Sequence, residues 1–143
     1  MIVSDAILYN TMRKLFLDDI RSPKDAIGLV PSHMNQFYWS NDWDVVRSHD
    51  EFVDFIEKNG VPDFVSFDHD LADEHYVEFM NLRDRSFEEY FPMEKTGYES
   101  AKWLVDRCLD LGVALPEYQV HSANQVGKQN IESYLENAKK HLF

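Results

Sequence analysis

Acidic, imidazole and hydroxyl side chains follow three short apolar segments of this 143-residue chain. The first segment ends in Asp18-Asp19, the second in Asp68-His69-Asp70, and the third in His121-Ser122 with Asn124 shortly after. Carboxylate oxygens are preferred ligands of Mg²⁺ and Mn²⁺, and histidine can transfer protons near neutral pH. These residue types together indicate chemistry on a phosphate group that a divalent cation neutralises.

Carboxylates gathered at one edge repel one another unless something neutralises them. Two ionised carboxylates 4 Å apart cost about 4 kcal/mol at an effective dielectric constant near 20. A bound cation or protonation removes this cost. We therefore expect a divalent cation, Mg²⁺ or Mn²⁺, at four residues: Asp18, Asp19, Asp68 and Asp70. For Asp19 and Asp70, capping or pairing with Arg21 or Lys128 is the competing explanation.

Two histidines and several polar residues are candidates for handling the phosphate itself. Either His69 or His121 would activate water and the other would protonate the leaving oxygen, or the Asp68 carboxylate would attack directly. The helix expected after Asn124 would offer backbone N–H groups to a phosphoryl oxygen. The candidates for phosphate binding are Arg21, Thr96, Ser122, Asn124 and Lys128. Thr96 could equally serve only as a helix cap, and Lys128 could simply be solvated.

Apolar segments alternate with amphipathic ones along the chain, which predicts an α/β fold. Strands are predicted at residues 14–19, 43–47, 61–67 and 118–121. Helices are predicted where a cap residue precedes, or a glycine follows, an apolar spacing of helical period. They lie between Ser48 and Gly60, between Thr96 and Gly112, and after Asn124. Because parallel strands end at one edge of a sheet, the three polar segments should meet there.

The length and composition predict a single domain with a proper core. A hydrophobic content of 44% with 14% aromatic residues is typical of a globular protein. Residues 1–13 are predicted to be an N-terminal extension and residues 14–143 one α/β domain, with a long loop at 22–42. The acidic, aromatic-rich segment 71–95 is predicted to be an insertion or lid, with disorder as the alternative.

The charge and the cysteine count exclude several classes of partner and site. A formal net charge of −12 argues against double-stranded DNA or an anionic membrane as partner, but a cation in a carboxylate cluster still permits a small phosphorylated ligand. The lone Cys108 excludes an intramolecular disulfide and a cysteine-rich zinc site. Without a long apolar run or a leader-like N-terminus, the chain is expected to be cytoplasmic. The oligomeric state is not indicated.

Three of these motifs resemble those of response-regulator receiver domains. Leu17-Asp18-Asp19 is similar to their acidic pair, the segment 62–68 to their phosphoacceptor strand, and Val120-His121-Ser122-Ala123 to the strand that ends in a phosphoryl-contacting hydroxyl residue. The fifth strand of a receiver domain and its lysine are missing, with Lys128 as a nearby substitute. Phospho-relay also has no use for His69, Asp70 or His121.

A closer match is the cyclic-phosphate processing receiver-domain family of bacteria and phages. The matching motifs are Leu15-Phe16-Leu17-Asp18-Asp19-Ile20-Arg21, Phe67-Asp68-His69-Asp70-Leu71, Lys95-Thr96-Gly97-Tyr98 and His121-Ser122-Ala123-Asn124. This resemblance implies a receiver-like (flavodoxin-like) three-layer sandwich whose short, mostly parallel four-stranded sheet lacks the fifth strand. It also implies a phosphoesterase acting on cyclic phosphates, such as RNA ends or cyclic nucleotides.

Two other functions fit the same residues. A non-catalytic receiver-like module would bind a nucleotide or phosphate without turnover. An aspartate-based phosphatase of the haloacid-dehalogenase type would use the Asp68-x-Asp70 pair, although that class places its pair on the first strand, not the third. The substitution Asp68→Asn distinguishes these functions: it should abolish the turnover of an enzyme, whereas a binding module would keep its affinity for the ligand.

Overall fold

A computed structural model of the chain describes residues 12–71 and 96–141. The predicted extension at 1–13 and the predicted insertion at 71–95 therefore lie almost entirely outside the described residues. The described part is an α/β domain of receiver-like fold, as predicted. None of its helices is long and apolar enough to cross a membrane.

The described residues form a sheet of four short strands, β1 (Lys14–Leu17), β2 (Trp43–Val46), β3 (Phe64–Phe67) and β4 (Glu117–Val120). Their spatial order is β2-β1-β3-β4, and all three strand pairs are parallel. The strands β1 and β3 are buried at every position, which explains why they appear in the sequence as continuous apolar runs rather than alternating ones.

The register of the strands brings their carboxyl ends level. The last residue of β1, Leu17, lies opposite the last residues of both β2 and β3, and Phe67 lies opposite the last residue of β4. The ladder continues for one residue beyond the strands. The backbone N–H groups of Asp18, Asp68 and His121 donate to the carbonyls of the neighbouring strands at 3.2, 2.9 and 2.9 Å. The first polar residue after each of these strands is therefore held by the sheet itself.

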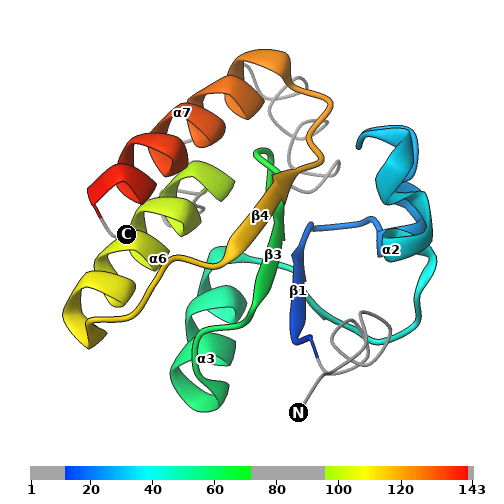
Figure 1. The fold of residues 1–143 in the computed structure, drawn as a ribbon. Helices are drawn as coiled ribbons and strands as arrows, with labels where there is room; N and C mark the ends of the chain where they lie inside the picture. The colour runs from blue at the N-terminus through cyan, green and yellow to red at the C-terminus, as the bar shows by residue number, and fades with distance from the viewer. Residues whose placement is uncertain (1–11, 72–95, 142–143) are drawn as a thin grey trace, which may run out of the picture.

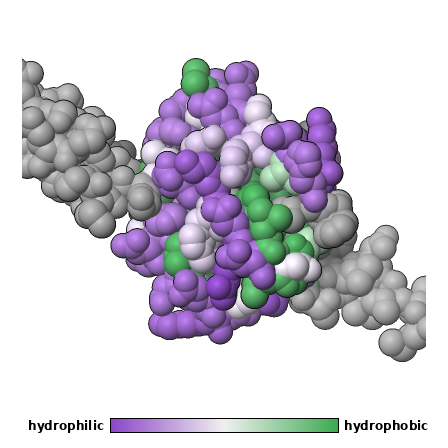
Figure 2. Space-filling model, turned by 90° about the vertical axis from the view of Figure 1, so that its left-hand side faces the viewer, coloured by the Kyte–Doolittle hydropathy of each residue, from purple (hydrophilic) through white to green (hydrophobic). Residues whose placement is uncertain are grey.

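Three longer helices pack together beside the sheet, α3 (His49–Asn59), α6 (Gly97–Leu111) and α7 (Gln125–His141) (Figure 1). The predicted caps are confirmed: Ser48 Oγ accepts the N–H of the third helical residue of α3, and Thr96 Oγ1 does the same for α6. The side of the molecule where α6 and α7 lie is mostly hydrophilic at its surface, broken by a narrow apolar strip (Figure 2). The buried apolar residues of these helices pack into the hydrophobic core, so their apolar stripes face inward, as their patterns predict.

The prediction of a long loop at residues 22–42 is wrong in part. This segment contains two 3₁₀-helices, η1 (Pro23–Ala26) and η2 (Ser32–Met34), and the short helix α2 (Asn35–Trp39). Local propensity does not predict such short turns. They are stabilised by tertiary packing, because the buried Tyr38 of α2 joins Phe16 of β1 in a small core.

Alternate residues of the sheet belong to two separate cores. Leu15 and Leu17 of β1 pack with the buried residues of α3, α6 and α7 in the larger core. Phe16, between them, points to the other face and packs against the 22–42 segment. The result is the predicted three-layer arrangement, with a thin layer of short helical turns on one face.

Candidate functional site

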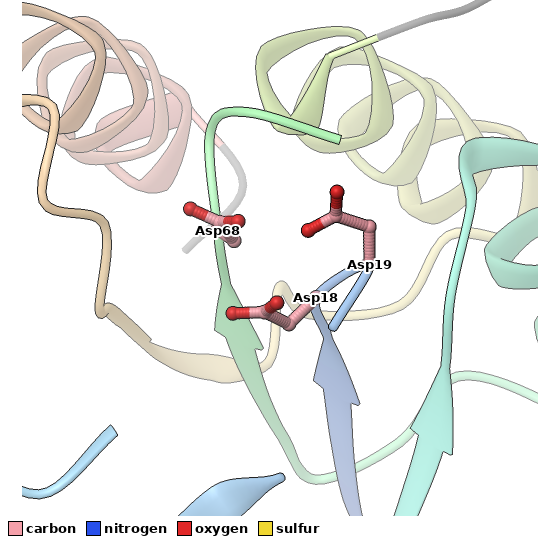
Figure 3. Close-up of side chains that lie close together, drawn as sticks. All are labelled: Asp18, Asp19 and Asp68. Carbon is pink, nitrogen blue, oxygen red and sulfur yellow. The ribbon is translucent and has the colours of Figure 1, made fainter. Parts of the chain in front are cut away.

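Three carboxylates meet at the carboxyl edge of the sheet. Asp18 and Asp19 follow β1 and Asp68 follows β3, and each offers an oxygen within 4.8 Å of the others (Figure 3). Asp18 and Asp68 are almost completely buried, with 0% and 2% exposure. This set of oxygen donors fits a divalent cation such as Mg²⁺ or Mn²⁺. Asp70, the fourth predicted ligand, lies outside this group.

Asp18 accepts four hydrogen bonds. Its Oδ1 accepts from the backbone N–H groups of Ile20 and Arg21 at 3.0 and 2.9 Å. Its Oδ2 accepts from Arg21 Nη1 at 3.2 Å and lies 3.0 Å from His121 Nε2. Burial by itself raises the pKa of Asp18, but the bond with His121 and the two backbone bonds outweigh it and hold this pKa well below its usual range. Asp18 is therefore ionised at neutral pH.

Asp68 has the opposite electrostatic character. Burial, with repulsion from Asp18 next, raises the pKa of Asp68 from 3.8 to about 7, although Arg21 acts in the other direction. The pair resembles other sites where neighbouring carboxylates have pKa values pushed apart, an arrangement typical of functional sites. Near neutral pH the protonated form of Asp68 is therefore favoured far more than for an ordinary carboxyl, unless a cation neutralises the site.

A buried series of hydrogen bonds runs to Asp18 from α2, on the face of the sheet where Phe16 lies. The Tyr38 hydroxyl of α2 lies 2.5 Å from Ser66 Oγ of β3, and Ser66 Oγ lies 2.7 Å from His121 Nδ1. The His121 ring is fully buried and stacks on Phe16, with ring centroids 4.3 Å apart and planes 7° from parallel. His121 could be predicted from the sequence, but Tyr38 and Ser66 were not. The only sequence signal for Ser66 is that it is a polar residue within an otherwise apolar strand, and Tyr38 of α2 has no such signal.

The direction of each bond in this series follows from counting protons. Tyr38 is buried, keeps its proton because burial raises its pKa, and has Ser66 as its partner among the described residues, so it donates to Ser66. The hydroxyl proton of Ser66 then goes to His121 Nδ1. His121 is therefore the neutral tautomer that carries its proton on Nε2 and donates it to Asp18. Burial lowers the pKa of His121 despite the pull of Asp18, in keeping with a neutral ring.

We expect Nδ1 of His121 to accept a hydrogen bond from Ser66, whose hydroxyl Tyr38 orients. Nitrogen-15 NMR of the wild type should show Nδ1 as an unprotonated, hydrogen-bonded nitrogen and Nε2 as protonated. In Ser66→Ala, Nδ1 loses its donor, so its resonance should shift strongly; Tyr38→Phe should produce a smaller shift. The control is Tyr98→Phe, because Tyr98 is partly buried and takes no part in this series of hydrogen bonds. A protonated Nδ1 in the wild type would contradict the assignment.

His69 has a partner of its own. Its Nδ1 lies 2.8 Å from Asp70 Oδ1, and Asn124 Nδ2 donates to the same oxygen at 3.4 Å. When Nδ1–H of His69 donates a hydrogen bond to Asp70, Nε2 of the same ring carries the lone pair that a general base requires. Asp70 is therefore bound by His69 and Asn124, whereas the alternative to a metal ligand was a cap or a pairing with Arg21 or Lys128.

Two glycines allow α6 and α7 to approach the end of β3. The Gly97 N–H donates to the His69 carbonyl at 2.8 Å, and a Cβ at Gly97 would lie 1.7 Å from the Asp68 carbonyl oxygen. A Cβ at Gly127 would lie 2.3 Å from Cγ of the His69 ring. Gly97 belongs to the Lys95-Thr96-Gly97-Tyr98 motif, whereas Gly127 gave no signal beyond being a glycine inside a helix.

The other predicted phosphate ligands surround this edge but have local partners. Thr96 Oγ1 accepts from the Glu99 N–H at 3.4 Å. Ser122 Oγ accepts from the Asn124 N–H at 3.1 Å, and Asn124 Oδ1 accepts from the Gly127 N–H at 2.9 Å. Lys128, by contrast, is one turn into α7 and half-buried. Thr96 and Asn124 therefore act as helix caps in this structure.

The chain is similar to one known protein family over most of its length. A family model described as the cyclic-phosphate processing receiver domain matches residues 13–137. No curated protein matches the chain. A solved structure of yeast Spc42 trimeric coiled-coil amino acids 181–211, fused to another protein, covers 92% of this chain and 74% of its own. Its 11% identity and TM-score of 0.45 are too low to support an argument.

Proposed function

The chain belongs to the cyclic-phosphate processing receiver domain family, and we propose that it is a metal-dependent phosphoesterase that opens a cyclic phosphate at an RNA end or in a nucleotide. The observation that carries the proposal is the group of three carboxylates Asp18, Asp19 and Asp68 beside the His69–Asp70 pair. Acidic ligands for a cation and an oriented histidine are together what hydrolysis of a phosphodiester requires.

Asp18, Asp19 and Asp68 would hold Mg²⁺ or Mn²⁺, and the cation, when bound, would neutralise charge on the phosphate. The protein contributes a rigid frame for these ligands. His121 holds Oδ2 of Asp18 through Nε2–H, and two backbone N–H groups hold Oδ1. Because both ring nitrogens of His121 are engaged and the ring is buried, we assign it to positioning Asp18 rather than to proton transfer with the substrate.

His69 is the residue to which we assign proton transfer. Asp70 orients it, and its Nε2 would take a proton from the attacking water as the water oxygen bonds to phosphorus. The bond from phosphorus to one ribose oxygen then breaks on the opposite side of the phosphorus. That oxygen would take a proton from solvent water, while His69 would release its proton to solvent. The product is a phosphate monoester, and the histidine is restored. Direct attack by Asp68 stays open as the alternative route.

Phosphate oxygens would be bound where α6 and α7 begin. Ser122, Asn124 and Lys128 lie at the start of α7, and Thr96 caps α6. The N-terminal turns of these helices supply partial positive charge and N–H groups. They are suited to a small phosphorylated ligand or an RNA end, and the net charge of −12 disfavours a longer duplex.

We expect turnover of a cyclic phosphate that requires a divalent cation. The purified protein is assayed on 2′,3′-cyclic, 3′,5′-cyclic and linear nucleotides, with Mg²⁺ or Mn²⁺ and with a chelator. Opening of one cyclic class, lost with chelator and restored by added cation, supports the proposal. His69→Gln should lower turnover by about 10²–10⁴-fold, the usual contribution of a general acid–base residue. Turnover that persists in chelator would overturn the metal requirement.

A second candidate is a non-catalytic module that binds a nucleotide or phosphate. It is favoured by one observation: the chain itself supplies positive charge to the carboxylate group, because Arg21 Nη1 lies 3.2 Å from Asp18 Oδ2. Saturable binding of one nucleotide in the same panel, with no turnover under any metal condition, would establish this second function in place of the first.

A further inference from the structure

Arg21 lies among the carboxylates that would hold the cation. Its Nη1 is 3.2 Å from Asp18 Oδ2 and 3.8 Å from Asp68 Oδ2. Asp19 attracts the same guanidinium electrostatically. All three members of the group therefore act on one arginine side chain, which stands where a divalent cation would have to approach.

A cation that binds Asp18 has to compete with the hydrogen-bond donors that Asp18 already has. A carboxylate offers about four lone-pair sites, and Asp18 already accepts four hydrogen bonds. Two of the donors are backbone N–H groups and one is the buried ring of His121. The fourth donor is the Arg21 guanidinium, on a long side chain that is 29% exposed. It is the donor that can leave at the least structural cost.

We propose that Arg21 is the counter-ion of the carboxylate group in the metal-free protein, that a divalent cation displaces its guanidinium, and that the displaced guanidinium then binds the phosphate of the substrate. The last step rests on the proposed function. Arginine is suited to both roles because its planar fork pairs with carboxylate and phosphate alike.

The backbone of Arg21 would stay in place during this exchange. Its N–H donates to Asp18 Oδ1, and its carbonyl accepts from Arg47 Nη1 at 2.5 Å. Only the side chain has to move, so the guanidinium remains within its own length of the cation. Metal and phosphate should therefore bind cooperatively, because the metal releases the group that the phosphate needs.

The first test is calorimetric titration of Mn²⁺ into the wild type, Arg21→Gln and Arg47→Gln. Arg47 is the matched control, since it carries the same charge nearby but its Nη1 donates to the backbone carbonyls of Asp18 and Arg21. Arg21→Gln should bind Mn²⁺ about tenfold more tightly than the wild type, and Arg47→Gln within about threefold of it. Equal affinities in all three proteins would overturn the exchange.

The second test is binding of inorganic phosphate with and without Mg²⁺. In the wild type Mg²⁺ should strengthen phosphate binding, and in Arg21→Gln this gain should shrink by about tenfold. An undiminished gain would overturn the phosphate step. Unfolding temperatures check that the variant folds: Mg²⁺ should raise that of Arg21→Gln more than that of the wild type, because the unpaired carboxylates need the cation more.

The outcomes separate this inference from the proposed function. If no nucleotide is turned over but the Mn²⁺ and phosphate effects occur, the phosphoesterase proposal fails and the exchange stands. If turnover depends on metal but Arg21→Gln and the wild type bind Mn²⁺ equally, the exchange fails and the phosphoesterase stands. Absence of Mn²⁺ binding in all three proteins would overturn both.

Discussion

The substitution Asp68→Asn is expected to give a protein that is inactive yet more stable than the wild type at pH 8 without metal. Asparagine keeps the shape of the side chain but removes a charge that is buried beside Asp18. A cation ligand or nucleophile is lost, so turnover should fall by at least about 10³-fold, as for other residues that contact the reacting group. Gain of stability with loss of function is typical of strained functional sites.

The sign of the stability change follows from the pKa of Asp68. Folding raises this pKa from 3.8 to about 7, so the folded state binds the proton more tightly than the unfolded state between these values. The free energy of unfolding of the wild type should therefore fall as the pH rises from about 4 to 7, and stay low above that. Asp68→Asn removes this loss, which we put on the order of 2–4 kcal/mol at pH 8.

Urea unfolding in chelator at pH 5 and pH 8 measures this change. Asp18→Asn is the matched control with the opposite sign, because the pKa of Asp18 is held low and its charge is stabilised by four donors. It should destabilise the protein at both pH values. Added Mg²⁺ should stabilise the wild type at pH 8 and the Asp68 variant far less. An Asp68→Asn protein that is no more stable than the wild type, or that keeps its turnover, would contradict our account of the site.

The meeting of the three polar segments could be predicted because it depends only on sheet topology. Parallel strands place their ends on one edge whatever their lengths, so errors of one to three residues in the strand bounds did no harm. The first strand was expected at 14–19 and ends at Leu17, and the last was expected at 118–121 and lies at Glu117–Val120. The resemblance to the cyclic-phosphate family added the overall fold, which is confirmed.

The partners of the site residues could not be predicted, because they come from distant parts of the chain. Tyr38 and Ser66 are 28 positions apart, and Ser66 and His121 are 55 apart. Tyr38 also lies in the segment that was expected to be a loop. No local pattern links these three residues, and only the packing of α2 on the sheet brings them together.

Asp70 and Arg21 show the same limit at short range. The spacing of Asp68 and Asp70 suggests two ligands for one cation, but the chain turns after β3 and carries Asp70 to His69 and Asn124. Arg21 was expected to bind phosphate, and its contacts with Asp18 and Asp68 were not predicted. In each case the residue types were informative. Side chains alternate in direction within a strand, but no such pattern predicts their direction in the turn that follows it.

The substitution Gly127→Ala is expected to abolish most of the activity while leaving the fold intact. Inside a helix this change is usually stabilising by about 1 kcal/mol. Here the new Cβ would lie 2.3 Å from Cγ of the His69 ring, so the ring must turn away and lose its bond to Asp70. Turnover should fall by about 10²-fold or more, as expected when a general base is misplaced. The measurement is steady-state turnover together with the unfolding free energy.

A double-mutant cycle with His69→Ala tests whether the effect of Gly127→Ala comes from its contact with the His69 ring. Once the ring is gone, the Cβ at position 127 has room, so Gly127→Ala should stabilise the His69→Ala protein although it does not stabilise the wild type. Gly97→Ala is the contrasting case. Its Cβ would lie 1.7 Å from the Asp68 carbonyl oxygen, and that backbone is fixed by its bond to Leu17, so the loss should be about 3 kcal/mol or more in either background. If Gly127→Ala has the same effect on stability with and without His69, the two residues do not interact, and the placement of the proposed base is wrong.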